Sequence, residues 1–301
     1  MTTKFFQDGA HEKRSAALSS VIAAVGLTGF KIIVGLATGS LGILAEAAHS
    51  GLDLMAALLT FLAVRISDKP ADRTHLYGHG KVENLSALFE TLLLLVTCLW
   101  IFYEATHRLF SHRVDLTVNF WSFAVMGTSI VVDISRSHML YRAAKKYHSQ
   151  ALEADALHFS TDIWSSGVVI LGLVCVKLSE WVEELAFLRQ ADSVAAILVG
   201  LIVVYVSIKL GFRTVQALLD VAPSGIEKKI ISAVEVLPGV TDCHHVRLRH
   251  SGPQLFVEIH VLVDGNQTLK EAHRLTEEIE HTIQRLIPNA DVTVHPEPNS
   301  N

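Results

Sequence analysis

Apolar residues gather into six long segments in the first two thirds of the chain, with short polar stretches between them. Each segment approaches the roughly 20 residues that a helix needs to cross the hydrocarbon core of a bilayer. The pattern therefore predicts an α-helical membrane bundle of six transmembrane helices. The segments are Ala16–Ala37, Leu41–Val64, Leu85–Phe110, Val118–Tyr141, Ala156–Leu178 and Val194–Leu210.

The pattern changes after Asp220, where no further segment is long enough to span a membrane. Amphipathic helical periodicity alternates here with strand-like runs, and the order αββαβ predicts a small α+β domain of ferredoxin-like, metallochaperone-like fold. We expect a transmembrane transport domain at residues 1–220, a cytoplasmic metal-binding domain at 221–301, and a loose tail from Pro296 onward. The expected elements are Ile226–Leu237, His244–His250, Leu255–Val263, Leu269–Leu286 and Val292–Val294.

The composition agrees with a membrane protein, because half of the residues are hydrophobic and only 18% are charged. The net charge of −5 does not indicate nucleic-acid binding. The three cysteines form no disulfide framework, and Cys243 is expected to be a free thiol rather than a thiolate ligand. We find neither a nucleophile arrangement nor a phosphate-binding glycine loop, so an enzyme or a nucleotide-driven pump is not expected.

Basic residues set the orientation in the membrane, because the side that is richer in lysine and arginine faces the cytoplasm. Both chain termini then lie in the cytoplasm, and the polar N-terminus has no signal-peptide pattern. The richer side carries Lys4, Lys13, Arg14, Arg65, Lys69, Arg73, Lys81, Arg136, Arg142, Lys145 and Lys146, and the other side carries Arg108, Arg113, Lys177 and Arg189.

Two histidine–aspartate pairs lie within the apolar segments, His49 with Asp53 in the second and His158 with Asp162 in the fifth. Residues four apart share one face of a helix, so each pair offers an imidazole and a carboxylate to the same point. Two nitrogens and two oxygens suit a divalent cation such as Zn²⁺. The alternative is a helix-packing hydrogen bond within each pair. Two pairs at matching depth favour a transport site, since ionisable residues inside the membrane are costly.

A second group lies in the loop between the second and third segments, where Asp72, His75 and His79 are close in sequence. Three ligands leave one position to water, which predicts a weaker or labile metal site. The alternative is a solvated loop whose histidines contact lipid headgroups.

Histidines are also frequent after Asp220. Residues two apart share one face of a strand, so His295 and Glu297 are expected to join His244 and His260 of the predicted hairpin. From the long helix, His273 is placed to bridge to this cluster. The alternation predicts that His245 points away from His244, and that His250 and His281 are surface residues. Two further pairs are expected inside the membrane, Lys31 with Glu46 and Asp133 with Arg136. Glu46 is alternatively a residue of the ion pathway.

Over almost its whole length the chain resembles the cation diffusion facilitator family of metal/proton antiporters, and most of all its bacterial zinc/iron efflux members. The resemblance rests on the two intramembrane pairs, the loop group, and the stretch Arg247-Leu-Arg249-His-Ser-Gly-Pro253. It implies a location in the cell inner membrane, a homodimer, and a charge interlock between Lys81 and Asp220. It also implies a binuclear cytoplasmic site at the dimer interface, formed by His244, His260, His273, His295 and Glu297.

The chain departs from the pattern of this family at three positions. His49 stands where the zinc/iron group usually has aspartate, which resembles the zinc-preferring branch. Glu297 stands where an aspartate is common, and His245 where relatives have an aspartate.

Together these features predict an exporter of Zn²⁺ that exchanges the metal for protons across the lipid bilayer, with Zn²⁺ also acting as a regulator. Metal ligands must be deprotonated, so protons and zinc compete for the same groups. Zinc is further expected to tighten the dimer by screening acidic faces around Glu277, Glu278 and Glu280. The alternatives are an exporter of Fe²⁺, Mn²⁺, Cd²⁺ or Co²⁺, a membrane-anchored metal sensor or scaffold, and a cation channel. Flux in sealed vesicles and electrical recording distinguish these classes.

Overall fold

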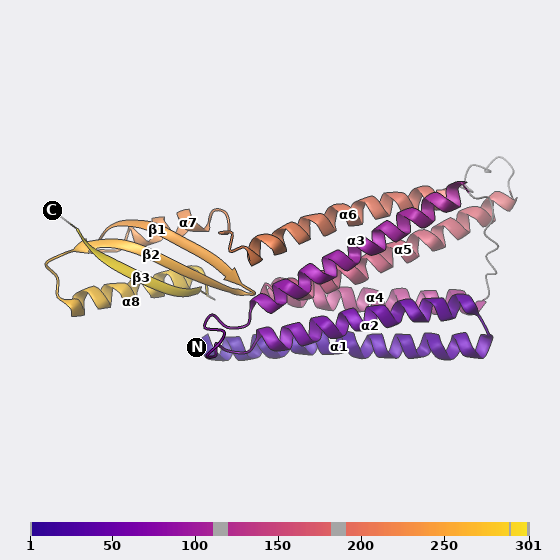
Figure 1. Cartoon of the computed structure of the whole chain (residues 1–301), viewed down its shortest axis with the longest axis horizontal. Coiled ribbons are helices and arrows are strands. Elements are labelled where there is room, and N and C mark those ends of the chain that lie inside the picture. The colour runs from indigo at the N-terminus through magenta and orange to yellow at the C-terminus, as the bar shows by residue number, and fades with distance from the viewer. Residues whose placement is uncertain (1, 111–119, 182–190, 289, 300–301) are drawn as a thin grey trace.

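The computed structural model of this chain describes residues 2–110, 120–181, 191–288 and 290–299. The molecule is elongated, with a bundle of long helices at one end and a small unit of strands and short helices at the other (Figure 1). Val118, Arg113 and Arg189, which entered the predictions above, lie outside the described residues.

Six long helices build the bundle in the described part of the chain, and each extends past one or both ends of its predicted apolar segment. A helix continues beyond the lipid into water, so the apolar run gives the span and not the helix ends. The first helix shows the largest difference, because it starts at Thr2 rather than Ala16. The helices are α1 (Thr2–Thr38), α2 (Leu41–Ser67), α3 (Lys81–Phe110), α4 (Phe120–Tyr147), α5 (Gln150–Trp181) and α6 (Ala191–Leu218).

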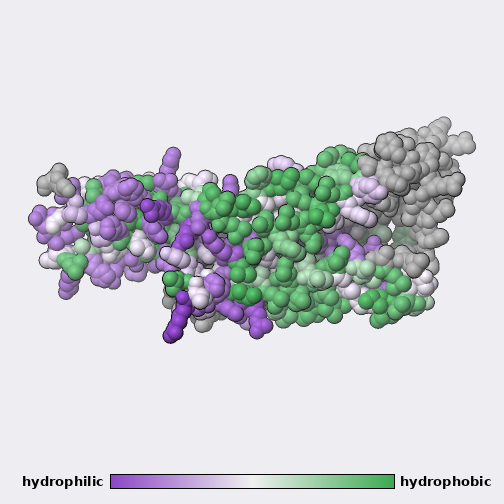
Figure 2. Space-filling model, in the orientation of Figure 1, coloured by the Kyte–Doolittle hydropathy of each residue, from purple (hydrophilic) through white to green (hydrophobic). Residues whose placement is uncertain are grey.

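Four of these helices, among the described residues, contain a stretch long and apolar enough to cross a membrane: Gly9–Thr38, Glu46–Ser67, Lys81–Trp100 and Ile197–Leu218. The helices α4 and α5 are similar in length to these four helices, but they carry buried charged residues. Apolar side chains cover most of the visible surface of the bundle, whereas the strand-containing unit is mainly polar outside (Figure 2). A bundle with this apolar surface fits a lipid environment.

Charged side chains of the bundle are paired as expected at two places. The Lys31 Nζ atom lies 3.3 Å from Glu46 Oε2 and donates to Ser50 Oγ at 2.7 Å. On α4, Arg136 Nη1 lies 3.5 Å from Asp133 Oδ1. The predicted ion pairs are therefore present in the structure.

The second unit has the predicted order αββαβ: α7 (Ile226–Val234), β1 (Val240–Ser251), β2 (Gln254–Asp264), α8 (Leu269–Leu286) and β3 (Ala290–Asn299). The sheet order is β1-β2-β3, with β1 antiparallel and β3 parallel to β2. The expectation of a loose tail from Pro296 is wrong, because β3 continues to Asn299 in register with Asp264. Prolines are compatible with an edge strand, where the missing N–H faces outward.

One face of this sheet is covered by both short helices. Alternate residues of β2 from Leu255 to Val263 are buried, and they pack against Ile230 of α7 and against Leu275, Ile279 and Ile283 of α8. Burying a side chain of this size contributes about 1.5–3 kcal/mol relative to exposure, before entropic costs. The opposite face of the sheet is left uncovered by α7 and α8, and its residues are partly exposed.

The turn between β1 and β2 contacts the bundle beside the start of α3. Asn84 Oδ1 accepts a hydrogen bond from the Gly252 N–H at 3.0 Å. Gly252 has a φ of +58°, and a Cβ there would lie 2.6 Å from the carbonyl oxygen of Gly80, so only glycine fits this approach. The Arg249 guanidinium lies 3.8 Å from the ring centre of Tyr77. We call this contact the junction.

The end of α6 adds an ion pair to the junction. Lys81 Nζ lies 2.9 Å from Asp220 Oδ1. The pair that the family resemblance implied as a charge interlock is thus formed between the first residue of α3 and the second residue after the end of α6.

Candidate metal sites

The two intramembrane pairs converge, with His49 and Asp53 on α2 and His158 and Asp162 on α5. His158 Nε2 lies 3.1 Å from Asp53 Oδ1 and 3.7 Å from Asp162 Oδ2. One ligand atom from each of His49, Asp53 and Asp162 lies within 4.8 Å of the others. The structure therefore brings the four residues together, and we call them the cage.

Burial within the cage is uneven. The His158 side chain is 2% exposed and the Asp53 side chain 13%, whereas the His49 side chain is 45% exposed. Imidazole and carboxylate donors in equal number match the ligands that zinc prefers. The cage thus has the chemistry of a divalent cation site in which one ligand, His49, is half-exposed.

The loop group is also assembled. His75 Nδ1 and His79 Nε2 each lie 3.4 Å from a different carboxylate oxygen of Asp72. The backbone N–H groups of His75 and Thr74 donate to Asp72 Oδ1, and these hydrogen bonds hold the pKa of Asp72 well below its usual value. Asp72 is therefore a carboxylate at neutral pH, ready to bind a cation.

The terminal cluster lies on the uncovered face of the sheet. His244, His260 and His295 occupy matching positions on β1, β2 and β3. Glu297 Oε1 accepts from His260 Nδ1 at 2.8 Å, and its other oxygen lies 3.3 Å from His244 Nε2. The hydrogen bond from His260 lowers the pKa of Glu297. These four residues come together as the sequence predicted.

His245 also belongs to this cluster, and the expectation that it points away from His244 is wrong. The pairing of β1 with β2 shifts register between His244 and Arg247, and His245 has a φ of +48°. This irregularity is a β-bulge, and a β-bulge breaks the alternation of side chains along a strand. One nitrogen each from His244, His245 and His260 therefore lies within 4.8 Å of the others. No signal in the sequence marks this bulge.

Asp242 was also missed by sequence reasoning. Its Oδ2 accepts a hydrogen bond from His244 Nδ1 at 2.8 Å, which turns the other nitrogen of that ring toward Glu297. Its spacing of two residues from His244 on a strand was the available signal.

His273 is not brought to the cluster within one chain. It lies on α8, on the covered side of the sheet, where its side chain is 72% exposed and its Nε2 lies 3.6 Å from Glu277 Oε1. The sheet separates it from His244 and His260, so its role as a ligand requires a second copy of the chain.

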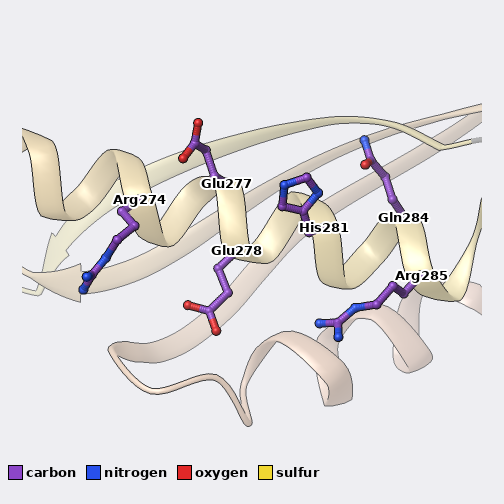
Figure 3. Close-up of a pocket in the computed structure, with 6 residues that line it drawn as sticks. All are labelled: Arg274, Glu277, Glu278, His281, Gln284 and Arg285. Carbon is purple, nitrogen blue, oxygen red and sulfur yellow. The ribbon is translucent and has the colours of Figure 1, made fainter. Parts of the chain in front are cut away.

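The outer face of α8 is mixed in charge rather than acidic. Arg274 and Arg285 project from this face together with Glu277 and Glu278 (Figure 3), and all four line an open cleft of about 650 Å³. His281 lines the same cleft, away from the terminal cluster, as a surface histidine. The expected acidic repulsion is thus partly offset within each chain.

Cys243 is buried in the core of the terminal unit. Burial raises the pKa of its thiol to about 11, and Glu235 and Asp242 add to this. A neutral thiol is a poor metal ligand, so Cys243 is a core residue.

Comparison with known proteins covers most of this architecture. Residues 17–219 match the model of the cation efflux transmembrane domain, and residues 222–299 match that of the cation efflux protein cytoplasmic domain. The cation-efflux pump FieF of Yersinia pestis (strain Pestoides F) is 33% identical over 292 residues, which are 95% of this chain and 93% of the relative. FieF of Yersinia pseudotuberculosis serotype O:3 (strain YPIII) matches with the same identity and coverage.

Among solved structures, the metal-bound C-terminal domain of the CzcD transporter from Thermotoga maritima is 35% identical. The match covers 25% of this chain and 90% of that domain, with a TM-score of 0.24.

Proposed function

Because the chain belongs to the cation diffusion facilitator family of cation efflux transporters, we propose that it exports Zn²⁺ in exchange for protons. The observation that supports this most is the convergence of His49, Asp53, His158 and Asp162 between α2 and α5. The family transports divalent metal cations, and the membrane location follows from the apolar helices. The identity of the metal and the counter-ion are the parts we propose.

The preference for zinc follows from the donor set. Imidazole nitrogens favour borderline cations over Mn²⁺, and four ligands suit a tetrahedral ion. His49 is the most exposed member of the cage. We assign to it the selection of zinc from the approaching ions.

Exchange for protons follows from competition at the same atoms. His158 Nε2 and the carboxylates of Asp53 and Asp162 bind metal only when deprotonated. Arrival of protons therefore expels zinc, and arrival of zinc expels protons. Rocking of helices about the cage would open it to one side of the membrane at a time.

We further propose the division into a transport domain at residues 1–220 and a metal-sensing domain at 221–301. The N-terminal end of α1 lies at the same end of the bundle as the α+β unit (Figure 1). With the basic residues on that side, both termini face the cytoplasm from the inner membrane. Zinc at the terminal cluster, shared by two copies through His273, would regulate the homodimer.

The test is zinc uptake into proteoliposomes of purified protein under an imposed pH gradient. We expect uptake to follow the gradient without nucleotide, and His49→Ala or Asp162→Ala to abolish it while dimer formation persists. His138→Ala is the matched control, because this exposed histidine lies on α4 outside the cage. Zinc flux that ignores both the gradient and a proton ionophore would refute the exchange. Near-normal flux in a cage variant would refute the site, and a panel of metals tests the choice of zinc.

A further inference from the structure

Two buried carboxylates lie beside the cage and have no role in the mechanism above. Glu90 of α3 is 1% exposed and Asp155 of α5 is fully buried. Asp155 precedes His158 by one turn of α5, toward the junction end of the bundle. Glu90 lies within electrostatic range of both Asp155 and His158. We call Glu90 and Asp155 the inner pair.

Most of the polar atoms around the inner pair lack a hydrogen-bond partner. These atoms are Glu90 Oε2, both carboxylate oxygens of Asp155, and His158 Nδ1. Thr60 donates a hydrogen bond to the other oxygen of that carboxylate, Glu90 Oε1. Burying carboxylate oxygens without partners costs several kcal/mol each, so a ligand is expected where they gather.

The neighbouring cationic side chain, that of Arg136, makes its contacts with other groups. The Arg136 guanidinium donates to Ser20 Oγ at 3.1 and 3.2 Å, lies 3.5 Å from Asp133, and stacks 3.5 Å from the centre of the Phe159 ring. It lies within electrostatic range of Asp155, and the Ser20 hydroxyl also interacts with that carboxylate, but neither group forms a hydrogen bond of normal geometry with its oxygens. The surroundings of the inner pair therefore remain attractive to a further cation.

We propose that Glu90 and Asp155, with Nδ1 of His158, form a second cation site inside the membrane, which holds the hydrated divalent ion between the cytoplasm and the cage. The proposal rests on the transport function proposed above. Carboxylates, an imidazole nitrogen and water are common ligands of divalent metals.

Transfer to the cage is short, because the two sites share one imidazole. His158 Nε2 faces Asp53 and Asp162, while Nδ1 is the other, unpartnered nitrogen of the same ring. The ligand atoms of Glu90, Asp155 and His158 do not converge as closely as those of His49, Asp53 and Asp162 in the cage, which lie within 4.8 Å of one another. The ion is therefore held more weakly here than in the cage, which suits a site that the ion must leave.

The test uses full-length protein in detergent, dialysed against increasing Zn²⁺ and analysed for bound metal. The variants are Glu90→Gln, Asp155→Asn and their combination, which keep shape and remove charge. We expect the combined variant to bind one ion fewer per protomer at high zinc and to keep the ions bound at low zinc. The control is Ser207→Ala on α6, a buried hydroxyl that also lacks a hydrogen-bond partner.

Transport gives a second readout. In proteoliposomes we expect each single variant to raise the KM for zinc about tenfold with a smaller change in kcat, because the lost site loads the cage. Should the combined variant fail to fold, the single variants and the charge-retaining Glu90→Asp decide the outcome.

Bound metal that is equal in the wild type and the folded variants would overturn the proposal, even if flux falls. If the wild type carries no zinc flux, the transport function fails while the missing ion still supports the site.

Discussion

The junction depends on one buried amide, and its removal gives a prediction that can be worked out from the structure. Asn84 is fully buried; its Oδ1 accepts from Gly252 N–H at 3.0 Å and its Nδ2 donates to Gln150 Oε1 at 2.9 Å. Asn84→Ala leaves the Gly252 N–H buried without an acceptor, which costs about 1–3 kcal/mol. We therefore expect the population with the β1–β2 turn undocked to rise about 5- to 150-fold.

Hydrogen exchange of the peptide around Gly252 measures this directly in detergent-solubilised protein. Exchange in Asn84→Ala should accelerate by the same factor, while the core of the terminal unit around Ile279 keeps its protection. Gln150→Ala is the control, because it removes the other bond of Asn84 and leaves the acceptor for Gly252. Unchanged exchange in Asn84→Ala, or equal acceleration in Gln150→Ala, would show that this hydrogen bond does not hold the junction.

Three further predictions concern single histidines. His49→Asp should broaden transport toward Cd²⁺, Mn²⁺ and Fe²⁺, because it replaces an imidazole nitrogen of the cage with a harder carboxylate ligand. Competition of these ions with zinc uptake measures the change, and an unchanged metal profile would exclude a role of His49 in selectivity. His245→Ala should weaken zinc binding by the terminal cluster in calorimetry, with His281→Ala as the silent control; equal affinities would remove His245 from the cluster. Burial lowers the pKa of His250 below its usual 6.5, with His148 adding to this. The folded state therefore favours neutral His250. The stability that this gives is fully present above pH 6.5, and the free energy of unfolding decreases as the pH falls below that value. Exchange of the β1–β2 turn should therefore quicken on acidification, and His250→Gln should abolish that pH dependence.

The sequence predicted most of the fold because the length of the apolar segments and the helical periodicity determine most of its elements. The bounds of α8 were predicted to the residue, since Thr268 and Glu271 form a capping box at its start and Pro288 follows its end. The start of α2 was predicted at Leu41, but the starts of the other long helices were not predictable from hydropathy, because polar helical turns such as those before Ala16 continue outside the lipid. The end of β3 was missed because Pro296 and Pro298 disfavour most strands.

The candidate sites divide in the same way. Spacing of four residues on a helix predicted that His49 would join Asp53, and the matching depth of the two pairs predicted the cage. Residues on different helices have no fixed spacing in the sequence. The proximity of Glu90 and Asp155, which lie on α3 and α5, could therefore not be predicted. His245 was misplaced because a bulge is a local backbone irregularity that hydropathy does not record.

The two outer strands of the sheet are both unsuited to adding another strand. The β1 edge is interrupted by register shifts at two places, between Val240 and Asp242 and between His244 and Arg247. The β3 edge contains Pro296 and Pro298, which offer no N–H to a neighbour. Irregular or proline-containing edges resist the edge-to-edge pairing that leads to aggregation. Two copies of this unit therefore have to meet through a face rather than through a continuous sheet, and the uncovered face is the one that carries the terminal cluster.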